Sequence, residues 1–215
     1  MTARIALVTG ANRGIGFETC RALGKLGYRV VLTARDPALG RQVAAGLASE
    51  GLDVRFRQLD VTDAASISRI KRLVDAEYRR LDVLVNNAAV YLDGDRNVFQ
   101  ITPKVLDSTL NVNVQGPWLL CRAFIPLMQK QGYGRIVNVS SEYGSLSSMT
   151  GDSPSYRISK AALNALTRVV ADTVDGCKIK VNAVCPGWVR TRMGGPGAEL
   201  EPHEAVDTIV RGLLR

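Results

Sequence analysis

The 215 residues suffice for one α/β domain with a large core, and an apolar content of 46% is ordinary for a globular protein. The net charge of +8 comes from basic residues scattered singly or in pairs, so we do not expect nucleic acid as a partner. One histidine and four cysteines without metal-site spacing exclude most metal centres and any mechanism built on a central histidine.

The sequence carries no expected export or membrane segment. The apolar start at 1–8 is too short for a signal peptide, and no segment approaches the ~20 apolar residues of a membrane span. Cys20, Cys121 and Cys185 lie in apolar context, which predicts buried free thiols and a reducing compartment. We therefore expect a soluble, cytoplasmic protein that does not bind a membrane.

Short β-branched runs alternate with helical patterns along the whole chain. The predicted strands are 5–9, 29–33, 54–59, 83–85, 135–139 and 178–184. The predicted helices are 15–26, 38–50, 64–79, 103–130, 155–174 and a last one from 203 to the end. Near-continuous apolar strands alternating with helices indicate a doubly wound (Rossmann) parallel sheet with helices on both faces. We expect one domain spanning 1–215, because no linker or repeat interrupts the pattern.

A glycine-rich turn at 9–16 follows the first predicted strand and opens the first helix. Gly10 permits the tight turn, Gly14 allows a pyrophosphate to approach, and Gly16 lets the helix pack on the sheet. The helix N-terminus then presents free N–H groups to the phosphates. The alternative is a plain turn, but the strand–turn–helix context favours a dinucleotide-binding loop.

The residues after the second strand indicate which dinucleotide binds. An acidic residue at this tip would bind the adenine ribose of NAD and repel a 2′-phosphate, but Ala34 stands there instead. Arg35 follows it, and Arg13 lies in the glycine turn, so two cations are available to a phosphate. The alternative for Arg35 is a solvated surface residue. Asp36, directly before Pro37, is expected to cap the next helix. We therefore expect NADP(H).

The third and fourth strands end in residues that suit the rest of such a cofactor. Asp60 and Val61 follow the third strand and would meet the adenine; a helix cap is the alternative, which residues 62 and 63 fit better. Asn87 and Ala88 follow the fourth strand, where small and turn-forming residues let the backbone approach a ribose. An ordinary strand–helix turn remains the alternative for this pair.

Two further polar positions are candidates for chemistry. Asn113 lies in a long helical stretch where Asn, Gly and Pro together predict a local break, and a water is the natural partner for its side chain. Ser140 and Ser141 follow the fifth strand, where the carboxyl ends of parallel strands face the ligand crevice. Their hydroxyls could donate to a substrate oxygen, or simply cap a loop.

Tyr156 and Lys160 lie four residues apart in one predicted helix, so both side chains share a face. A fixed ammonium beside a tyrosine favours the phenolate and lowers the phenol pKa from its usual value of about 10. Such a tyrosine exchanges protons more readily near neutral pH. The alternative is an unrelated pair on a helix surface.

Taken together, these residues resemble the short-chain dehydrogenase/reductase family, and within it the carbonyl-reductase-like members. The matching motifs are, in chain order, Gly10-x-x-x-Gly14-Ile15-Gly16, Asp60-Val61, Asn86-Asn87-Ala88, Asn113, Ser141, Tyr156-x-x-x-Lys160 and Pro186-Gly187-x-x-x-Thr191. They arrive in the order and spacing of the family over nearly the whole chain.

The resemblance implies a role for each polar group. Tyr156 would be the proton donor in carbonyl reduction, Lys160 would lower its pKa and hold the nicotinamide ribose, and Ser141 would bind the substrate oxygen. Asn113 would anchor a water in a proton relay. The residues expected to contact the cofactor are Gly10, Asn12, Arg13, Gly14, Ile15, Gly16, Arg35, Asp60, Val61, Asn87, Ala88, Tyr156, Lys160, Pro186, Gly187, Val189 and Thr191.

We therefore expect a carbonyl reductase that uses NADPH on a small ketone or aldehyde. An alcohol dehydrogenase acting oxidatively is one alternative, and an inactive cofactor-binding scaffold is another. The chain stops where the family continues into a seventh strand, so we expect an unpaired sheet edge. We also expect a homodimer through the helices at 103–130 and 155–174, since Leu163, Leu166 and Val170 form an apolar stripe predicted to face outward.

Overall fold

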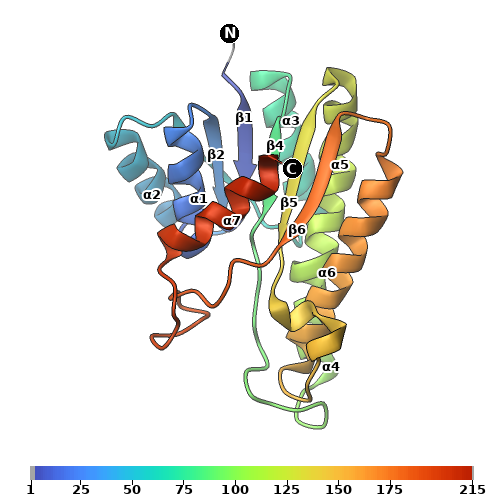
Figure 1. Ribbon diagram of the computed structural model, residues 1–215. Helices are drawn as coiled ribbons and strands as arrows, with labels where there is room; N and C mark the ends of the chain where they lie inside the picture. The colour runs from blue at the N-terminus through green and yellow to red at the C-terminus, as the bar shows by residue number, and fades with distance from the viewer. Residues whose placement is uncertain (1–2, 215) are drawn as a thin grey trace.

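In the computed structural model, which describes residues 3–214, six strands form one parallel sheet in the order β3-β2-β1-β4-β5-β6 (Figure 1). The strands are β1 Ile5–Val8, β2 Arg29–Ala34, β3 Val54–Gln58, β4 Val83–Asn86, β5 Gly134–Val139 and β6 Ile179–Val184. The order reverses between β1 and β4, which are paired neighbours. Ligands of such sheets bind at the carboxyl ends of the strands beside this reversal. The predicted doubly wound fold is confirmed.

Helices cover both faces of the sheet. They are α1 Gly14–Lys25, α2 Pro37–Ser49, α3 Ala64–Tyr78, α4 Pro103–Leu110, α5 Gly116–Gln131, α6 Pro154–Thr173 and α7 Pro202–Leu214. Figure 1 shows α1, α2 and α7 on one face and α3, α5 and α6 on the other. Alternate residues of β1 serve the two cores: Ile5 and Leu7 join one hydrophobic cluster, and Ala6 and Val8 join the other. The sheet therefore needs strands that are apolar on both sides.

The long helical stretch predicted at 103–130 is interrupted, as its Asn, Gly and Pro residues indicated. A single π-helical turn, Asn111–Gln115, separates α4 from α5. Such turns widen the helix locally and often occur at functional sites. The predicted last helix is α7, and its end at residue 215 lies outside the described residues.

The stripe on α6 that was expected to face outward packs inward instead. Leu163 and Val170 are buried, and Val170 and Leu166 pack in the hydrophobic cluster to which α3 and α5 also contribute. The prediction that this stripe faces outward was wrong, because α6 uses these apolar side chains to cover the apolar face of the sheet. The partly or fully exposed residues of α6 at helical spacing are Ile158, Ala162, Ala165 and Val169.

Within residues 3–214, β6 pairs only with β5, so it forms an edge of the sheet as expected. Helix α7 crosses beside this edge and packs on β5, β6 and α1 (Figure 1). A Cβ on Gly212 would lie 2.7 Å from Val184 Cγ1, so α7 approaches the sheet closely there. No helix in this part of the chain combines the length and apolar character needed to cross a bilayer.

Candidate active site

The turn between β1 and α1 requires glycine at the predicted positions. Gly10 and Gly14 have φ angles of 61° and 55°, a region that other residues rarely adopt. A Cβ on Gly10 would lie 2.8 Å from Ala88 Cα, and one on Gly16 would lie 2.5 Å from Asn87 Nδ2. Among the described side chains, none caps α1, so the N–H groups of its first turn remain available to an anion. The turn therefore fits the pyrophosphate of a dinucleotide.

Hydrogen bonds join this turn to the end of β4. Thr9 Oγ1 accepts from the backbone N–H groups of Asn87 and Ala88 at 3.0 and 2.9 Å. Asn87 Nδ2 donates to the carbonyls of Thr9 and Gly10 at 2.8 and 3.1 Å. The Asn87 side chain therefore holds the glycine turn in place. The other two predicted residues of the turn are the half-buried Asn12 and Ile15.

The tip of β2 carries positive charge and no acid. Ala11 N donates to Thr33 O at 2.9 Å, which joins the glycine turn to the end of this strand. Ala34 is buried, and both Arg13 and Arg35 are exposed. Within residues 3–214, neither guanidinium forms an ion pair. Two free cations without a neighbouring acid fit a 2′-phosphate.

The acidic residues beside this edge are held locally. Asp36 accepts from the N–H groups of residues 38 and 39 and caps α2, as predicted. Asp60 Oδ1 accepts from the N–H and hydroxyl of Thr62 at 2.9 and 2.7 Å, and Asp63 caps α3. Val61 is 6% exposed and packs at the strand tip. Asp60 thus orders the turn that presents Val61 at the edge of the crevice.

Tyr156 and Lys160 share one face of α6, as their spacing predicted. Lys160 Nζ lies 5.4 Å from the centroid of the Tyr156 ring. The ammonium donates to the carbonyl of Val139 at 2.7 Å, at the carboxyl end of β5. Lys160 is 2% exposed, so this bond ties α6 to the sheet beneath it.

The electrostatics of this pair differ from the prediction. Burial raises the pKa of Tyr156, and its hydrogen bond with the Ser141 hydroxyl opposes that rise. Burial lowers the pKa of Lys160 to about 8. The expected depression of the Tyr156 pKa by Lys160 is therefore wrong for this structure, because burial disfavours both charged forms. Tyr156 keeps its proton at neutral pH.

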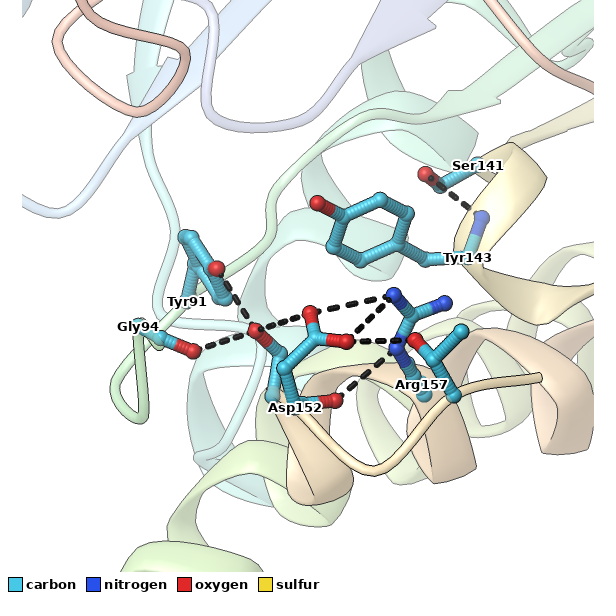
Figure 2. Close-up of polar contacts among 8 residues, drawn as sticks. Tyr91, Gly94, Ser141, Tyr143, Asp152 and Arg157 are labelled. Atoms are coloured by element: carbon cyan, nitrogen blue, oxygen red, sulfur yellow. Dashed lines mark hydrogen bonds and ion pairs between the residues drawn. The ribbon is translucent and has the colours of Figure 1, made fainter. Parts of the chain in front are cut away.

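The two serines after β5 have separate partners. Ser140 Oγ donates to Asn164 Oδ1 at 2.7 Å and is buried, so it is structural. Ser141 Oγ accepts from Tyr143 N at 3.2 Å, a bond drawn in Figure 2. Its hydroxyl is also the one that influences the Tyr156 pKa. Of the two hydroxyls, Ser141 is therefore the one placed to reach a substrate oxygen.

Asn113 lies in the π-helical turn with its side chain fully buried. Its Oδ1 accepts from Val90 N at 2.8 Å, and its Nδ2 donates to Val90 O at 2.9 Å and to Ser159 Oγ at 3.0 Å. Both donors of the amide are thus used by protein groups. Oδ1 accepts one of these bonds and has a second lone pair, so the water expected at this side chain stays a prediction. The Asn113 side chain joins the segment after β4 to α6.

The segment after β6 forms another wall of the crevice. Pro186 is buried, and Gly187 has a φ of 83°. Val189 is 4% exposed and pairs with Leu200 in an isolated bridge. Arg190 N also donates to Leu200 O at 2.7 Å. These bonds close 185–201 into a loop held at both ends.

Thr191 brings this loop over the glycine turn. Its Cγ2 would lie 3.2 Å from a Cβ on Gly14. Its hydroxyl accepts from the N–H groups of Met193 and Gly194, which fixes the rotamer. Cys185 is exposed, whereas Cys20 and Cys121 are buried as expected. The prediction of a buried Cys185 fails because β6 ends at Val184 and its edge is uncovered.

Two residues at the site were not identified from sequence. The Tyr91 ring lies 4.8 Å from that of Tyr156, and its hydroxyl shares a hydrogen bond of 2.8 Å with Ser153 Oγ. Asp93 is fully buried and bonds to the first turn of α6. Both come from the segment after β4, far from α6 along the chain. No local pattern indicates such contacts.

Tyr143 stands over the guanidinium of Arg157 (Figure 2). The Arg157 Cζ lies 4.0 Å from the Tyr143 ring centroid, and Arg157 pairs with Asp152 at 3.0 Å. The Tyr143 ring meets the Tyr156 ring edge-on, with centroids 6.0 Å apart. Tyr156 therefore lies between two tyrosines, Tyr91 and Tyr143.

Known proteins share this arrangement of sequence and fold. A family pattern described as short chain dehydrogenase matches residues 4–201. Carbonyl reductase (NADPH) 1 of Oryctolagus cuniculus is 36% identical over 252 residues, covering 96% of this chain and 89% of that protein. The (+)-neomenthol dehydrogenase of Arabidopsis thaliana is 33% identical over 271 residues, covering 98% and 91%. The NADPH-bound carbonyl reductase from chicken fatty liver superposes with a TM-score of 0.89 at 32% identity, covering 99% and 87%.

Proposed function

The chain belongs to the short-chain dehydrogenase/reductase family, and from that premise we propose that it reduces a ketone or aldehyde with NADPH, with Tyr156 as the proton donor. It is an NADP-dependent oxidoreductase of the carbonyl-reductase-like type. The observation that carries the finer proposal is the half-buried Tyr156, whose pKa is raised, beside the Ser141 hydroxyl at the carboxyl edge of the sheet.

The residues that would hold the cofactor lie along this edge. The glycine turn and the uncapped start of α1 suit the pyrophosphate, and Arg13 and Arg35 suit the 2′-phosphate. Thr191, over Gly14, suits the nicotinamide end. NADPH, when bound, supplies the hydride.

Three side chains of the protein would then manage the substrate oxygen. Ser141 donates a hydrogen bond to it and stabilises the negative charge that develops during reduction. Tyr156 supplies the proton, which it retains until that oxygen becomes basic. Lys160 is held by Val139 O and contributes a positive charge beside the ring while it stays protonated.

The oxidative direction is a second candidate, because one relative is named a dehydrogenase. The same groups serve both directions, with Tyr156 accepting rather than donating the proton. Burial raises the pKa of Tyr156, so the phenol is protonated at neutral pH, which is the form that the reductive direction requires.

The test is to mix the purified protein with NADPH and a panel of ketones and aldehydes and to follow cofactor oxidation. Reduction of at least one carbonyl compound, with the alcohol formed in equal amount, is expected. Alcohols with NADP form the parallel panel. Activity on alcohols alone would favour the oxidative candidate, and activity on neither would favour a cofactor-binding scaffold.

We also infer a homodimer through the outer faces of α5 and α6. Ile158, Ala162, Ala165 and Val169 follow helical spacing on α6, and Ile158 and Val169 are 46% and 64% exposed. Trp118 of α5 is 42% exposed. Small and apolar side chains on this surface would let α5 and α6 pack closely against the same two helices of a second copy. Sedimentation velocity should show a dimer that Val169→Asp dissociates, and a wild-type monomer at all concentrations would contradict it.

A further inference from the structure

Asp93 is a fully buried carboxylate in the segment between β4 and α4. Its Oδ2 accepts from Ser155 N at 2.6 Å, from Ser155 Oγ at 2.6 Å and from Tyr156 N at 3.2 Å. Ser155 is 62 residues away along the chain. A distant carboxylate thus binds the first turn of the helix that carries the proton donor.

Helix α6 has no local cap that could do the same. Pro154 begins the helix and has no N–H, and the side chain of Ser153 before it makes no capping bond. Arg157 N donates to the carbonyl of Ser153 at 3.0 Å. Ser155 and Tyr156 therefore hold the first-turn N–H groups that need a partner, and Asp93 is the partner of both.

The remaining contacts join the same two segments. Ser153 has a φ of 52°, and its N–H donates to the carbonyl of Arg96 at 2.8 Å. Its hydroxyl donates to the carbonyl of Gly94 and meets the Tyr91 hydroxyl at 2.8 Å, bonds drawn in Figure 2. The segment at 91–96 and the start of α6 therefore form one hydrogen-bonded unit.

We propose that Asp93 is a positioning residue for the reaction. By capping α6 from outside, it fixes the backbone at Tyr156 and so aims the phenol. It also anchors the segment that places Tyr91 against the Tyr156 ring, with centroids 4.8 Å apart. Its effect on turnover rests on the proposed function, but its effect on the helix does not.

The conservative variant is Asp93→Asn. Within the described residues, Asp93 Oδ1 has no hydrogen-bond partner, so only one oxygen of the carboxylate is used. An asparagine keeps one acceptor oxygen for the helix and places its amide where the unused oxygen lies. Asp93→Ala removes the acceptor altogether. The matched control is Asp63→Ala, which removes the cap of α3 at a helix that carries no proposed catalytic group.

The first readout is steady-state kinetics with a substrate from the carbonyl panel. Asp93→Ala should lower kcat by about 10-fold or more, because small misplacements of a catalytic group are costly, and should leave the Kd for NADPH within about 2-fold. Asp93→Asn should recover most of kcat, and Asp63→Ala should leave it unchanged. Equal kcat in Asp93→Ala and wild type, or equal losses in Asp93→Ala and Asp63→Ala, would overturn the proposal.

The second readout is amide hydrogen exchange by NMR, which needs no activity. In the wild type, the Ser155 and Tyr156 amides should be protected although they lie in a first turn. Asp93→Ala should speed their exchange by about 10-fold or more, the scale of a lost cap. Unprotected amides in the wild type would overturn the proposal even if Asp93→Ala does not fold. If the wild type turned over no carbonyl compound, the proposed function would be contradicted. The amide hydrogen exchange of Ser155 and Tyr156 would still test whether Asp93 holds the start of α6.

Discussion

The carboxylates on the two sides of the crevice are held in different ways. On the cofactor side, the acidic residues bond to near neighbours: Asp36 caps α2 through residues 38 and 39, Asp60 binds Thr62, and Asp63 caps α3. Each contact lies within three residues of its carboxylate. These turns are therefore specified where they occur in the sequence.

On the catalytic side, the polar groups bond across the fold. Asn113 reaches Val90 and Ser159, which are 23 and 46 residues away. Asp93 reaches Ser155, 62 residues away. Because these contacts depend on tertiary packing, the catalytic geometry is coupled to the segment after β4. The comparison teaches that changes at the local carboxylates Asp36 and Asp63 should be tolerated better than changes at Asp93, which joins distant segments.

The largest expected effect is on kcat, and it distinguishes proton transfer from cofactor binding. Tyr156→Phe should lower kcat by about 100-fold or more, the scale of a lost general acid, while the Kd for NADPH stays near the wild-type value. Steady-state kinetics and cofactor titration provide the two numbers. Tyr28→Phe changes a tyrosine directly before β2 and outside the site, and as the control it should leave both kcat and the Kd for NADPH unchanged. A loss of only a few-fold in Tyr156→Phe would remove its assignment as proton donor.

Lys160 should make the stability of the catalytic half depend on pH. Its pKa falls from an ordinary 10.5 to about 8 in the fold, so the unfolded chain binds a proton across this window that the folded protein lacks. Relative to Lys160→Met, the wild type should therefore gain stability as pH rises from about 8 to 10.5, by on the order of 3 kcal/mol. Denaturant unfolding of both proteins at several pH values measures this. A constant difference between them would contradict the burial of the ammonium.

The Arg35→Ala variant tests how the cofactor side of the crevice distinguishes NADPH from NADH. Arg35→Ala should weaken NADPH binding by roughly 10-fold to 100-fold, since one charge-assisted bond is worth about 1.5–3 kcal/mol, and should leave NADH binding alone. Arg41→Ala, an exposed arginine on α2, changes the net charge equally and is the control. Equal weakening of NADPH and NADH in Arg35→Ala would show that this arginine does not contact the 2′-phosphate.

The smallest expected effects are those of two glycine substitutions on the free energy of unfolding. Gly46 is exposed in α2, and a Cβ added there would meet nothing within 4 Å, so Gly46→Ala should stabilise the fold by about 0.5–1 kcal/mol. Gly10→Ala should destabilise it by at least about 1 kcal/mol, because of its φ of 61° and its approach to Ala88. Thermal and denaturant unfolding compare the two. Similar effects from both would show that the turn does not require glycine at position 10.

The same contrast explains what the sequence could predict. The alternation of strands and helices, the tight turn at Gly10 and the Asp36 cap all depend on neighbouring residues, and each was confirmed. The spacing of Tyr156 and Lys160 placed both on one face, because a helix has a fixed repeat.

The features that sequence could not supply depend on packing. The protein partners of the Asn113 side chain depend on packing, because the segment after β4 folds against the π-helical turn. Burial sets the direction of the Tyr156 pKa, and burial is not visible in a four-residue spacing. The inward turn of Leu163 likewise depends on how α6 lies on the sheet.

The most direct test of the division between the halves is a double-mutant cycle on Arg35 and Tyr156. NADPH Kd and kcat would be measured for wild type, Arg35→Ala, Tyr156→Phe and the double variant. If one half binds the cofactor phosphate and the other transfers the proton, Arg35→Ala should change Kd alone, Tyr156→Phe should change kcat alone, and the double variant should show both losses in full. A Tyr156→Phe variant that weakens NADPH as much as Arg35→Ala does would contradict this account.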